Sequence, residues 1–446
     1  MTRSIFEIEE LSGLSTALGQ EIERAYAIAT PMAATLTKLP DITAKGVSLT
    51  GLPQLWRQIV DQSAHLASPW MSGHMDTAPH PAAALTQALV AALNNNLLFR
   101  ELSPLASAVE EHIITFFIDN LELGSDWHGV FASGGSISNL TALFAAVGGF
   151  APKLDRDRFH LILPASGHVS LVKAAGVLGL QKQNVHHVAC DNAGRIDLTA
   201  LETCLASIPS NDRPIVTSVL GTTIHGSVDD IAGIDQLCKK FGAWHHVDAI
   251  YGTALAFSKD YRHFLAGLSE ADSIVLGPQK WLYVPRVSAM CLIRGESNFN
   301  SRLGASVPYS LGALDHRGRW GLQGSRPADA VVLWATLQVV GTDLLADTVD
   351  SSVRKTREFH EALKAATGFE PTHTPDLNLQ TFRVGKPDPD GARLRRVQEI
   401  LAERGRTWMS VSRWRDEALM RAVLLSPSLT SVHISGFVSD LEQAAR

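Results

Sequence analysis

The sequence contains few cysteines. Its 446 residues include 4 of them, and no two have the CxxC spacing of zinc or redox motifs. They are Cys190, Cys204, Cys238 and Cys291. Because no secretion signal accompanies them, we predict buried free thiols in a cytoplasmic protein.

Long apolar runs and an excess of basic residues are also missing. No apolar run approaches the roughly 20 residues that cross a bilayer. Residues 1–10 are acidic where a signal peptide would be basic and then apolar. The net charge of −6 argues against a nucleic-acid-binding surface and gives no reason to propose a membrane surface.

The chain is long for a single hydrophobic core, so we expect more than one domain. Residues 1–100 are mostly helical in pattern and form a predicted N-terminal helical segment. A large domain is predicted over residues 101–346 and a smaller C-terminal α/β domain over residues 347–446. Residues 296–325, rich in Gly, Ser and Arg, are predicted to form a mobile loop before a helix at 326–346.

Short apolar runs alternate with helical stretches from about residue 127. Strands are predicted at 130–132, 161–163, 215–220, 244–247 and 273–276, and later near 377–382 and 422–425. Predicted helices between the first five strands span 140–148, 170–178, 198–207 and 231–241. This alternation predicts an α/β fold with a mainly parallel sheet, whose ligands lie beyond the carboxyl ends of the strands.

A glycine turn at residues 133–139 is the first of four features that follow these strands. Its central residues are Gly134, Gly135 and Ser136. Small residues let backbone N–H groups approach a phosphate, and the N-terminus of the following helix favours negative charge. An isolated turn of this composition also serves as an ordinary strand-to-helix connection, with Ser as N-cap.

Two polar residues follow later strands. Asp248 ends an apolar strand, where a carboxylate is costly unless it is paired. A protonated pyridine nitrogen would pair it and make a cofactor ring an electron sink. His168 follows the strand at 161–163, and its flat ring can lie on such a cofactor. Taken singly, Asp248 is more typical of a helix cap or a strand-end residue, and a lone histidine such as His168 is more often structural or solvated.

Lys280 completes the series, 32 residues after Asp248. A lysine that forms a Schiff base needs a partly desolvated amine, and apolar and aromatic residues follow at 281–284. A lone lysine is usually solvated. The joint order of glycine turn, histidine, aspartate and lysine, each at or near a strand end, predicts a pyridoxal phosphate site.

Two other kinds of site receive less support. No GxGxxG follows the first strand of the α/β region, which argues against dinucleotide binding. The adjacent histidines at 186–187 and 245–246 make poor zinc ligands, because neighbouring residues on a strand point to opposite faces. We therefore predict no metal site.

A set of motifs then carries a family resemblance. They lie at 94–104 with Glu110, 133–139, 166–175, 221–230, 246–252, 271–273 and 322–326. Together, from about residue 68 onward, they resemble the group II pyridoxal-phosphate-dependent amino-acid decarboxylases, which include diaminobutyrate, glutamate and aromatic amino-acid decarboxylases. The stretch 257–273 is most similar to the diaminobutyrate branch. The resemblance implies the aspartate-aminotransferase-like fold (fold type I), with a seven-stranded type of sheet and helices on both faces.

The resemblance also implies roles for individual residues. Lys280 forms the Schiff base with pyridoxal 5'-phosphate, Asp248 pairs with the pyridine nitrogen, and His168 stacks on the ring. Thr222 lies near the edge of the ring. The phosphate is held at the glycine turn by Gly134, Gly135 and Ser136. The implied reaction converts an L-amino acid to its amine and carbon dioxide.

Family members are homodimers whose active sites take residues from both chains. The resemblance therefore implies a homodimer with shared active sites and a small amino-acid substrate. Residues 72–74 and 99–104 are candidate walls of the substrate pocket.

Three positions depart from the family pattern. Gln279 replaces a histidine that usually helps to bind the phosphate, so it can donate a hydrogen bond there but brings no charge. Gly277 stands where a polar side chain is common. The loop tyrosine that commonly returns a proton to the substrate has no clear counterpart. His316 lies close to the matching position and Tyr309 seven residues earlier, and either, or neither, is the donor.

These departures keep alternatives open. An altered proton donor is compatible with oxidation, transamination or β- or γ-elimination on the same scaffold. A non-catalytic dimeric scaffold is a further alternative, against which the retained Lys280 and Asp248 argue. Four arginines are candidates for binding a substrate carboxylate and equally typical of structural residues: Arg100, Arg286, Arg319 and Arg326.

Overall fold

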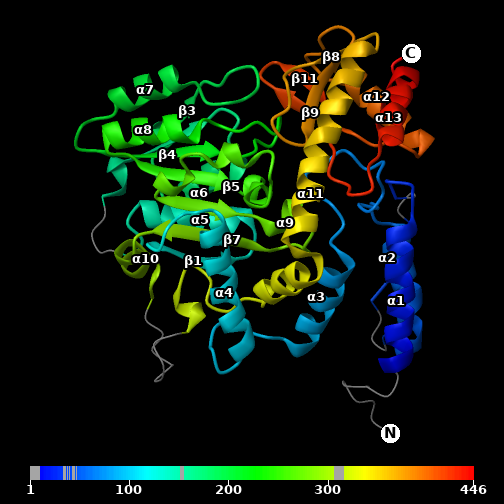
Figure 1. Cartoon of the computed structure of the whole chain (residues 1–446), viewed down its shortest axis with the longest axis horizontal. Helices are drawn as coiled ribbons and strands as arrows, with labels where there is room; N and C mark the ends of the chain where they lie inside the picture. The colour runs from blue at the N-terminus through cyan, green and yellow to red at the C-terminus, as the bar shows by residue number, and fades with distance from the viewer. Residues whose placement is uncertain are drawn as a thin grey trace. The chain divides into compact units, whose positions relative to one another are not determined.

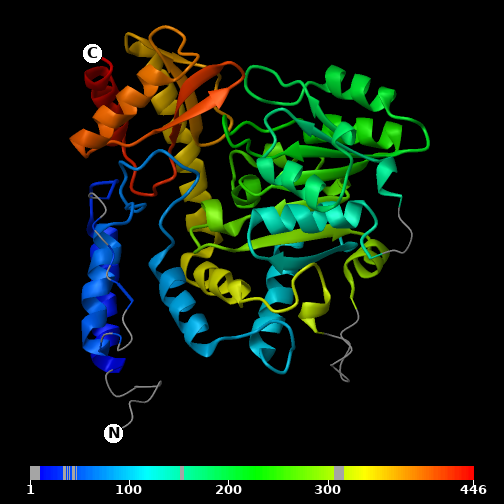
Figure 2. The same cartoon turned by 180° about the vertical axis from the view of Figure 1, so that it is seen from behind.

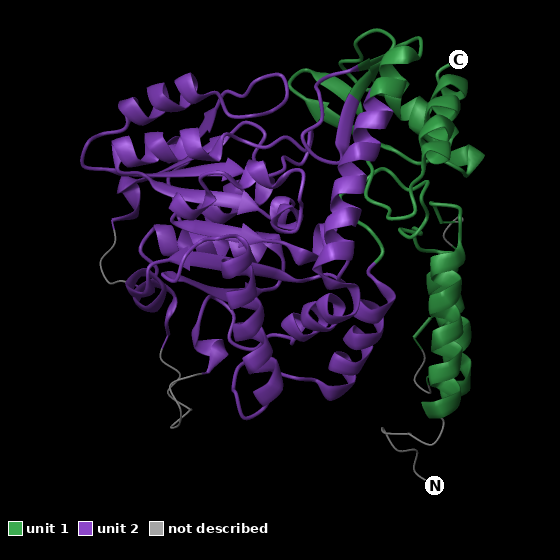
Figure 3. Ribbon diagram, in the orientation of Figure 1, with its two compact units in different colours: residues 1–78, 361–370, 382–446 green, residues 79–360, 371–381 purple. Residues whose placement is uncertain are grey.

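The computed structural model describes most of the chain, which divides into two compact units. The described residues are 11–33, 37, 39, 41–42, 46, 48–150, 155–305 and 316–446. Unit 1 comprises Met1–Ala78, Glu361–Glu370 and Phe382–Arg446, and unit 2 comprises Pro79–His360 and Pro371–Thr381 (Figure 3). The division into three segments at residues 100 and 346 remains a prediction.

Unit 2 is built on a seven-stranded sheet in the order β1-β7-β6-β5-β4-β2-β3 (Figure 1). The strands are β1 (Trp127–Ala132), β2 (Phe159–Pro164), β3 (Val185–Val188), β4 (Arg213–Val219), β5 (Trp244–Ala249), β6 (Ser273–Leu276) and β7 (Ala289–Arg294). Neighbouring strands run parallel from β3 to β6, and β7 runs antiparallel to both β6 and β1. The predicted mainly parallel α/β sheet is confirmed.

Helices cover both faces of this sheet, seen from behind in Figure 2. Adjacent residues of β4 belong to different core clusters: Ile215 packs with residues of α5 and α6, and Val216 with residues of α7 and α8. Burial on both faces explains why the strands are continuous apolar runs. Before residue 305, the α-helices of unit 2 in the described part of the chain are α3 (Pro81–Leu93), α4 (Pro104–Asn120), α5 (Gly135–Ala146), α6 (Val169–Val177), α7 (Leu198–Ser207), α8 (Ile231–Phe241), α9 (Pro278–Trp281) and α10 (Glu296–Leu303).

Two strands of this sheet were not predicted. Strand β3 lies at the edge of the sheet and carries a half-exposed histidine pair, so it lacks an apolar run. Strand β7 follows β6 without the long helical crossover that joins parallel strands. Its antiparallel direction breaks the strand-helix alternation on which the prediction depended.

The prediction of a mobile loop over residues 296–325 was wrong for its first part. Helix α10 forms there because Phe299 and Leu303 are buried in a core cluster with Val130 of β1. Residues 306–315 lie outside the described part of the chain. The helix predicted at 326–346 is the first part of the longer α11 (Asp329–Ala365), which is kinked at Gly341 with φ 72°.

Helix α11 is also long and apolar enough to qualify as a candidate membrane span. Its most apolar 18-residue window has a mean hydropathy of 1.3, and 39% of that window is buried within the structure. Core helices of globular proteins meet the same criteria, so this helix is weak evidence for a membrane span.

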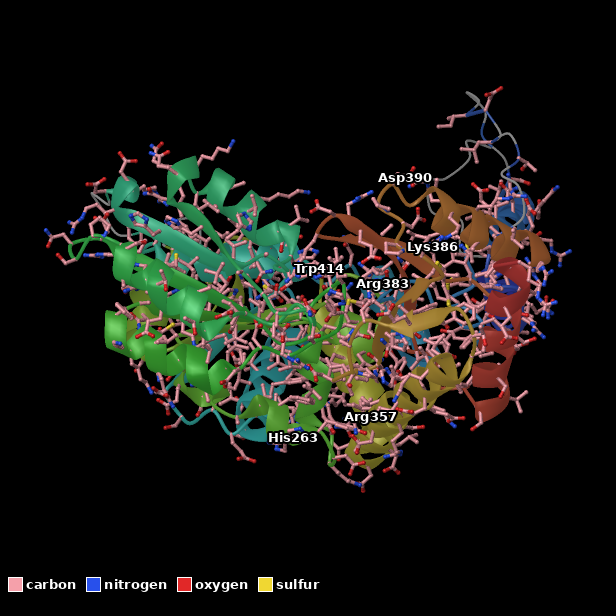
Figure 4. All side chains as sticks on the ribbon, turned by 90° about the horizontal axis from the view of Figure 1, so that it is seen from above. His263, Arg357, Arg383, Lys386, Asp390 and Trp414 are labelled. Atoms are coloured by element: carbon pink, nitrogen blue, oxygen red, sulfur yellow. The ribbon has the colours of Figure 1, made fainter. Side chains whose placement is uncertain are left out.

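Unit 1 combines helices with most of a four-stranded sheet in the order β10-β11-β9-β8. The helices and strands that lie wholly in it are α1 (Leu11–Ala27), α2 (Leu52–Asp61), α12 (Ala392–Arg404), β10 (Ser410–Trp414), β11 (Glu417–Val423) and α13 (Ser431–Ala444). Strands β8 (Phe369–Pro371) and β9 (Leu379–Val384) have residues in both units. Arg383 of β9, labelled in Figure 4, forms ion pairs with Glu417 at 2.8 Å and Glu370 at 3.0 Å. Strands predicted near 377–382 and 422–425 overlap β9 and β11.

Residues 72–74, a predicted pocket wall, are held by the β10–β11 region of unit 1. The Ser72 N–H donates to the Trp408 carbonyl at 3.0 Å, and Arg421 donates to the Gly73 carbonyl at 2.9 Å. A Cβ at Gly73 would lie 1.8 Å from the ring of Trp408, so only glycine fits this position. The His74 ring lies over the same indole, with centroids 4.9 Å apart.

Candidate cofactor site

The predicted site residues follow strands that are neighbours in the sheet. Asp248 is in β5, His168 follows β2, Thr222 follows β4 and Lys280 follows β6, and these four strands are parallel and adjacent. Their carboxyl ends therefore share one edge of the sheet. The glycine turn follows β1 and reaches the same edge, because Ala132 at the end of β1 pairs with Ala289 at the start of β7.

Ile250 joins three of these motifs. Its backbone N–H donates to Asp248 Oδ1 at 3.2 Å. A Cβ placed on Gly135 of the glycine turn would lie 3.1 Å from the Ile250 side chain, and a Cβ on Gly277 would lie 2.5 Å from the Ile250 carbonyl oxygen. The glycine turn, Asp248 and the segment that carries Lys280 are thus in direct contact around one residue. No sequence pattern singles out Ile250.

The glycine turn begins helix α5. Gly134 has φ 84°, a left-handed conformation that favours glycine, and it is the N-cap of this helix. The N–H groups of the first helical turn have no partner within the helix and can donate to an anion. In the same turn Ser138 Oγ is buried without a hydrogen-bond partner among the described residues, whereas Ser136 is exposed.

Gln323 holds the glycine turn through two hydrogen bonds to Ser133. Its Oε1 accepts from the Ser133 N–H at 2.8 Å, and its Nε2 donates to Ser133 Oγ at 2.8 Å. This pairing gives a physical role to the motif at 322–326, which the sequence marked only by resemblance.

Gln279 lies close to the same turn. Its Oε1 accepts from the Ser288 N–H at 2.8 Å, just before β7, so Nε2 is the group of this amide that can donate to a ligand. The neighbouring Val287 lies 3.6 Å from the position of a Cβ on Gly134. The hydroxyl of Ser288 is buried without a partner in the described part of the chain. Amides and hydroxyls without a fixed charge therefore gather where a phosphate is predicted.

Asp248 is a buried carboxylate with neutral partners. It is 5% exposed, and Oδ2 accepts from Asn139 Nδ2 at 2.9 Å. Among the described residues no basic side chain forms an ion pair with it. A buried carboxylate without a cation is costly, so this group fits a protonated pyridine nitrogen.

His168 is the N-cap of α6 and its ring is exposed. The ring atom Nδ1 accepts from the Ser170 N–H at 3.2 Å and contacts Ser170 Oγ at 2.7 Å. Because a backbone N–H can only donate, the neutral ring carries its proton on Nε2. An exposed flat ring at this edge is compatible with stacking on a cofactor.

Lys280 is half-buried in the short helix α9, and its backbone N–H donates to the Gly277 carbonyl at 3.0 Å. The apolar surroundings that the sequence predicted are present: Trp281 and Leu282 are 0% and 2% exposed. Burial also raises the pKa of the neighbouring Tyr283. Thr222 is fully buried, and its Oγ1 accepts from the Ser227 N–H at 3.1 Å, which closes the turn after β4.

Of the two candidate proton donors, His316 lies in the described part of the chain and Tyr309 does not. His316 is 7% exposed, and its Nδ1 accepts from the Arg100 N–H at 3.2 Å. Its ring meets Phe99 edge-on, with centroids 5.2 Å apart. The structure therefore places His316 against residues 99–100 of the other predicted pocket wall.

Arg326 forms a buried ion pair with Glu110. The carboxylate of Glu110 is fully buried between Arg326 and Arg317, at 2.8 Å and 3.1 Å from their Nη2 atoms. These arginines hold the pKa of Glu110 below its usual value despite its burial. Among the four candidate arginines, Arg326 therefore serves the fold, and Arg100 is paired with Glu111 at 2.6 Å.

The adjacent histidines of β5 have separate partners. His245 Nε2 contacts Ser218 Oγ at 2.8 Å, whereas His246 contacts Ser273 Oγ at 2.9 Å and Asn139 Oδ1 at 3.0 Å. Among the described residues there is no group of three or more His, Cys, Asp or Glu placed to hold a metal ion.

Comparison with known proteins connects this geometry to a family. Residues 45–385 match the pyridoxal-dependent decarboxylase conserved domain. The chain is 30% identical over 360 residues to aspartate 1-decarboxylase of Aliivibrio fischeri, over 73% of this chain and 65% of that protein. It is 29% identical over 356 residues to L-2,4-diaminobutyrate decarboxylase of Rhizobium meliloti, over 78% of this chain and 71% of the relative.

Solved structures give the same fold. Mouse CSAD in apo form aligns with a TM-score of 0.89 at 22% identity, covering 98% of this chain and 99% of the other. Oryza sativa TDC with PLP and tryptamine aligns with a TM-score of 0.90 at 18% identity, covering 100% and 99%. The matched domain spans more than half of the sequence. The chain therefore belongs to the pyridoxal-dependent decarboxylase family, whose cofactor, pyridoxal 5'-phosphate, fits the residues gathered at this edge of the sheet.

Proposed function

We propose that this protein removes the carboxylate of an L-amino acid as carbon dioxide and releases the corresponding amine, with Lys280 as the residue that binds the cofactor. The observation that carries the proposal is the buried Asp248 carboxylate, which has neutral partners only and lies on the strand next to the one that leads to Lys280. Bound pyridoxal 5'-phosphate supplies an aldehyde that condenses with amines and a ring that accepts the electron pair of the broken bond.

The chain's own residues would divide the remaining work. Asp248 would hold a proton on the ring nitrogen by its negative charge. The exposed ring of His168 would cover one face of the cofactor and present Nε2–H as a donor. The N-terminus of α5, through Gly134, Gly135 and Ser136, and the Nε2 of Gln279 would donate to the phosphate. Because Gln279 is uncharged, its contribution does not change with pH.

A short, charged side chain is the proposed substrate feature. Three relatives are named for decarboxylation of aspartate, of 2,4-diaminobutyrate and, in a mouse protein 28% identical over 391 residues, of cysteine sulfinic acid. These three compounds are small amino acids with a charged group close to Cα. We propose that this chain takes a member of the same class.

A homodimer is the proposed assembly, with active sites that take residues from both chains. Helix α3 supports an interface, because Leu85, Leu89 and Leu93 are 58%, 60% and 62% exposed and lie four residues apart on one face. Light scattering of the purified protein would give twice the chain mass. We further propose that the enzyme works in the cytoplasm, without a membrane or nucleic-acid partner.

The test is an absorbance scan with pyridoxal 5'-phosphate, followed by detection of carbon dioxide and amine. Wild type should show a visible band and release carbon dioxide with one of L-aspartate, L-cysteine sulfinate or L-2,4-diaminobutyrate. Lys280→Ala should lose both signals, and the control Lys173→Ala, at an exposed lysine of α6, should keep them. Ammonia, a keto acid or an aldehyde as the product would replace decarboxylation by elimination, transamination or oxidation. No band in wild type would favour a non-catalytic scaffold.

A further inference from the structure

A continuous chain of hydrogen bonds runs through the buried sheet and ends at the two residues that would meet the cofactor ring. It links Trp244 Nε1 to Ser273 Oγ at 2.9 Å, Ser273 Oγ to His246 Nδ1 at 2.9 Å, and His246 Nε2 to Asn139 Oδ1 at 3.0 Å. Asn139 Nδ2 then donates to Asp248 Oδ2 at 2.9 Å. The chain joins β5, β6 and α5.

The direction of every bond in this chain is fixed from both ends. An indole N–H can only donate, and an ionised carboxylate can only accept. Asn139 must therefore turn its NH₂ group to Asp248 and its oxygen to His246. The His246 ring then carries hydrogen on Nε2 and accepts at Nδ1 from the Ser273 hydroxyl, which in turn accepts from Trp244. No donor faces a donor anywhere along the path.

Burial strengthens this arrangement. His246 and Ser273 are 0% exposed, and Asn139 is 1% exposed. Burial also lowers the pKa of His246 to about 3, so the ring stays neutral and keeps one N–H donor and one acceptor. Hydrogen bonds in such a low-dielectric interior are strong when they are satisfied and costly when one partner is lost.

The chain branches at Asn139. The second hydrogen of its amide donates to Ser170 Oγ at 3.0 Å, and the Ser170 hydroxyl contacts His168 Nδ1 at 2.7 Å. The Ser170 hydroxyl therefore donates to Nδ1, which places the His168 proton on Nε2. One amide group thus orients the Asp248 carboxylate and, through the Ser170 hydroxyl, supports the same His168 tautomer that the Ser170 N–H favours.

We propose that Asn139 and His246 are positioning residues for the cofactor ring: through one polarised hydrogen-bond chain they hold Asp248 as an acceptor and His168 as an Nε2–H donor. The inference rests on the proposed function, because it assigns this hydrogen-bond chain a role at the cofactor ring. It predicts that cofactor binding needs a hydrogen-bond donor at residue 246 and does not need an imidazole ring there.

The first experiment needs no cofactor. In ¹⁵N-histidine-labelled apoprotein, imidazole ¹⁵N shifts should show His246 and His168 as neutral Nε2–H tautomers at neutral pH, each assigned by the loss of its signals in His246→Gln and His168→Gln. A protonated or Nδ1–H ring at His246 would overturn the proposed direction of the chain.

The second experiment compares equilibrium binding of pyridoxal 5'-phosphate by matched variants. His246→Leu removes the donor to Asn139, whereas the amide of His246→Gln retains one. We expect the dissociation constant to rise about tenfold or more in His246→Leu and in Asn139→Ala, since a hydrogen bond to a charged group is lost or left unsupported. His246→Gln should stay close to wild type. The control Ser218→Ala removes the partner of His245 on the other face and should leave binding unchanged.

These outcomes separate the two ideas. Equal binding by His246→Leu, His246→Gln and wild type would overturn the positioning role and leave the proposed function intact. Failure of wild type to bind pyridoxal 5'-phosphate would overturn the proposed function, while the histidine tautomers would still report on the hydrogen-bond chain. If Asn139→Ala does not fold, the His246 pair and the tautomer measurement decide the question.

Discussion

Replacing Gly277 with alanine tests the contact that places the Lys280 segment. A Cβ at this position would lie 2.5 Å from the Ile250 carbonyl oxygen and 2.7 Å from its side chain. Ordinary contacts begin near 3.4 Å, so the backbone must separate by about 0.9 Å. Ile250 also contacts Gly135 and Asp248, and the displacement would therefore reach the glycine turn and the carboxylate as well.

The expected cost follows from overpacking. Forcing one extra methyl group into a close-packed interior destabilises a protein by about 1–3 kcal/mol. Gly277→Ala should lower the urea midpoint accordingly and weaken binding of pyridoxal 5'-phosphate. The family's common polar side chain at this position would meet the same carbonyl oxygen, so the local backbone here requires glycine.

Gly176→Ala is the matched control. Gly176 lies in helix α6 with no atom within 4 Å of the added Cβ. Alanine is favoured over glycine inside helices by about 0.5–1 kcal/mol, so this variant should be slightly more stable than wild type. If Gly277→Ala is as stable as wild type and binds the cofactor equally well, the reasoning about Ile250 is refuted.

Three further predictions concern buried charge, thiols and pH. Glu110→Ala should destabilise by about 3–5 kcal/mol in urea unfolding, because it leaves two buried arginines without their carboxylate. Glu111→Ala breaks a partly exposed pair with Arg100 and should cost at most about 1 kcal/mol; equal effects would contradict the burial argument. Cys204, the one cysteine that is not buried, should react first with a thiol reagent, and all 4 cysteines should react in denaturant. Rapid reaction of all four thiols in the folded protein would contradict this prediction. Burial lowers the pKa of His246 to about 3 and of His373 to about 4, so between pH 6.5 and 4 these two side chains bind more protons in the unfolded chain than in the folded one. As the pH is lowered through that window, wild type should therefore lose stability relative to His246→Gln when urea midpoints are compared; parallel curves would show that His246 does not contribute.

The sequence predicted the parallel core of the sheet because its strands are buried on both faces. An apolar run such as 273–276 is visible without any structure, and the glycine turn, Asp248 and Lys280 follow such runs in order. Strand β3 was missed because its edge position lets it carry His186 and His187. Helix α10 was missed because the composition around it is typical of loops.

The supporting contacts of the site could not be read from local sequence. Asn139 and Asp248 are 109 residues apart, and Glu110 and Arg326 are 216 apart. Both pairings exist because strand order brings distant segments together, and nothing in either segment specifies its partner. Ile250 was missed for a different reason. It contributes through its backbone atoms and through its closeness to Gly135 and Gly277, and an isoleucine after a strand has no distinctive sequence pattern.

The most direct test of the central claim is to locate the covalent attachment of the cofactor. The protein would be incubated with pyridoxal 5'-phosphate, reduced with borohydride to fix any Schiff base, digested and mapped by mass spectrometry. We predict a single reduced adduct on Lys280 and its absence in Lys280→Ala. An adduct on another lysine, or none in wild type, would contradict the assignment of this edge of the sheet as the cofactor site.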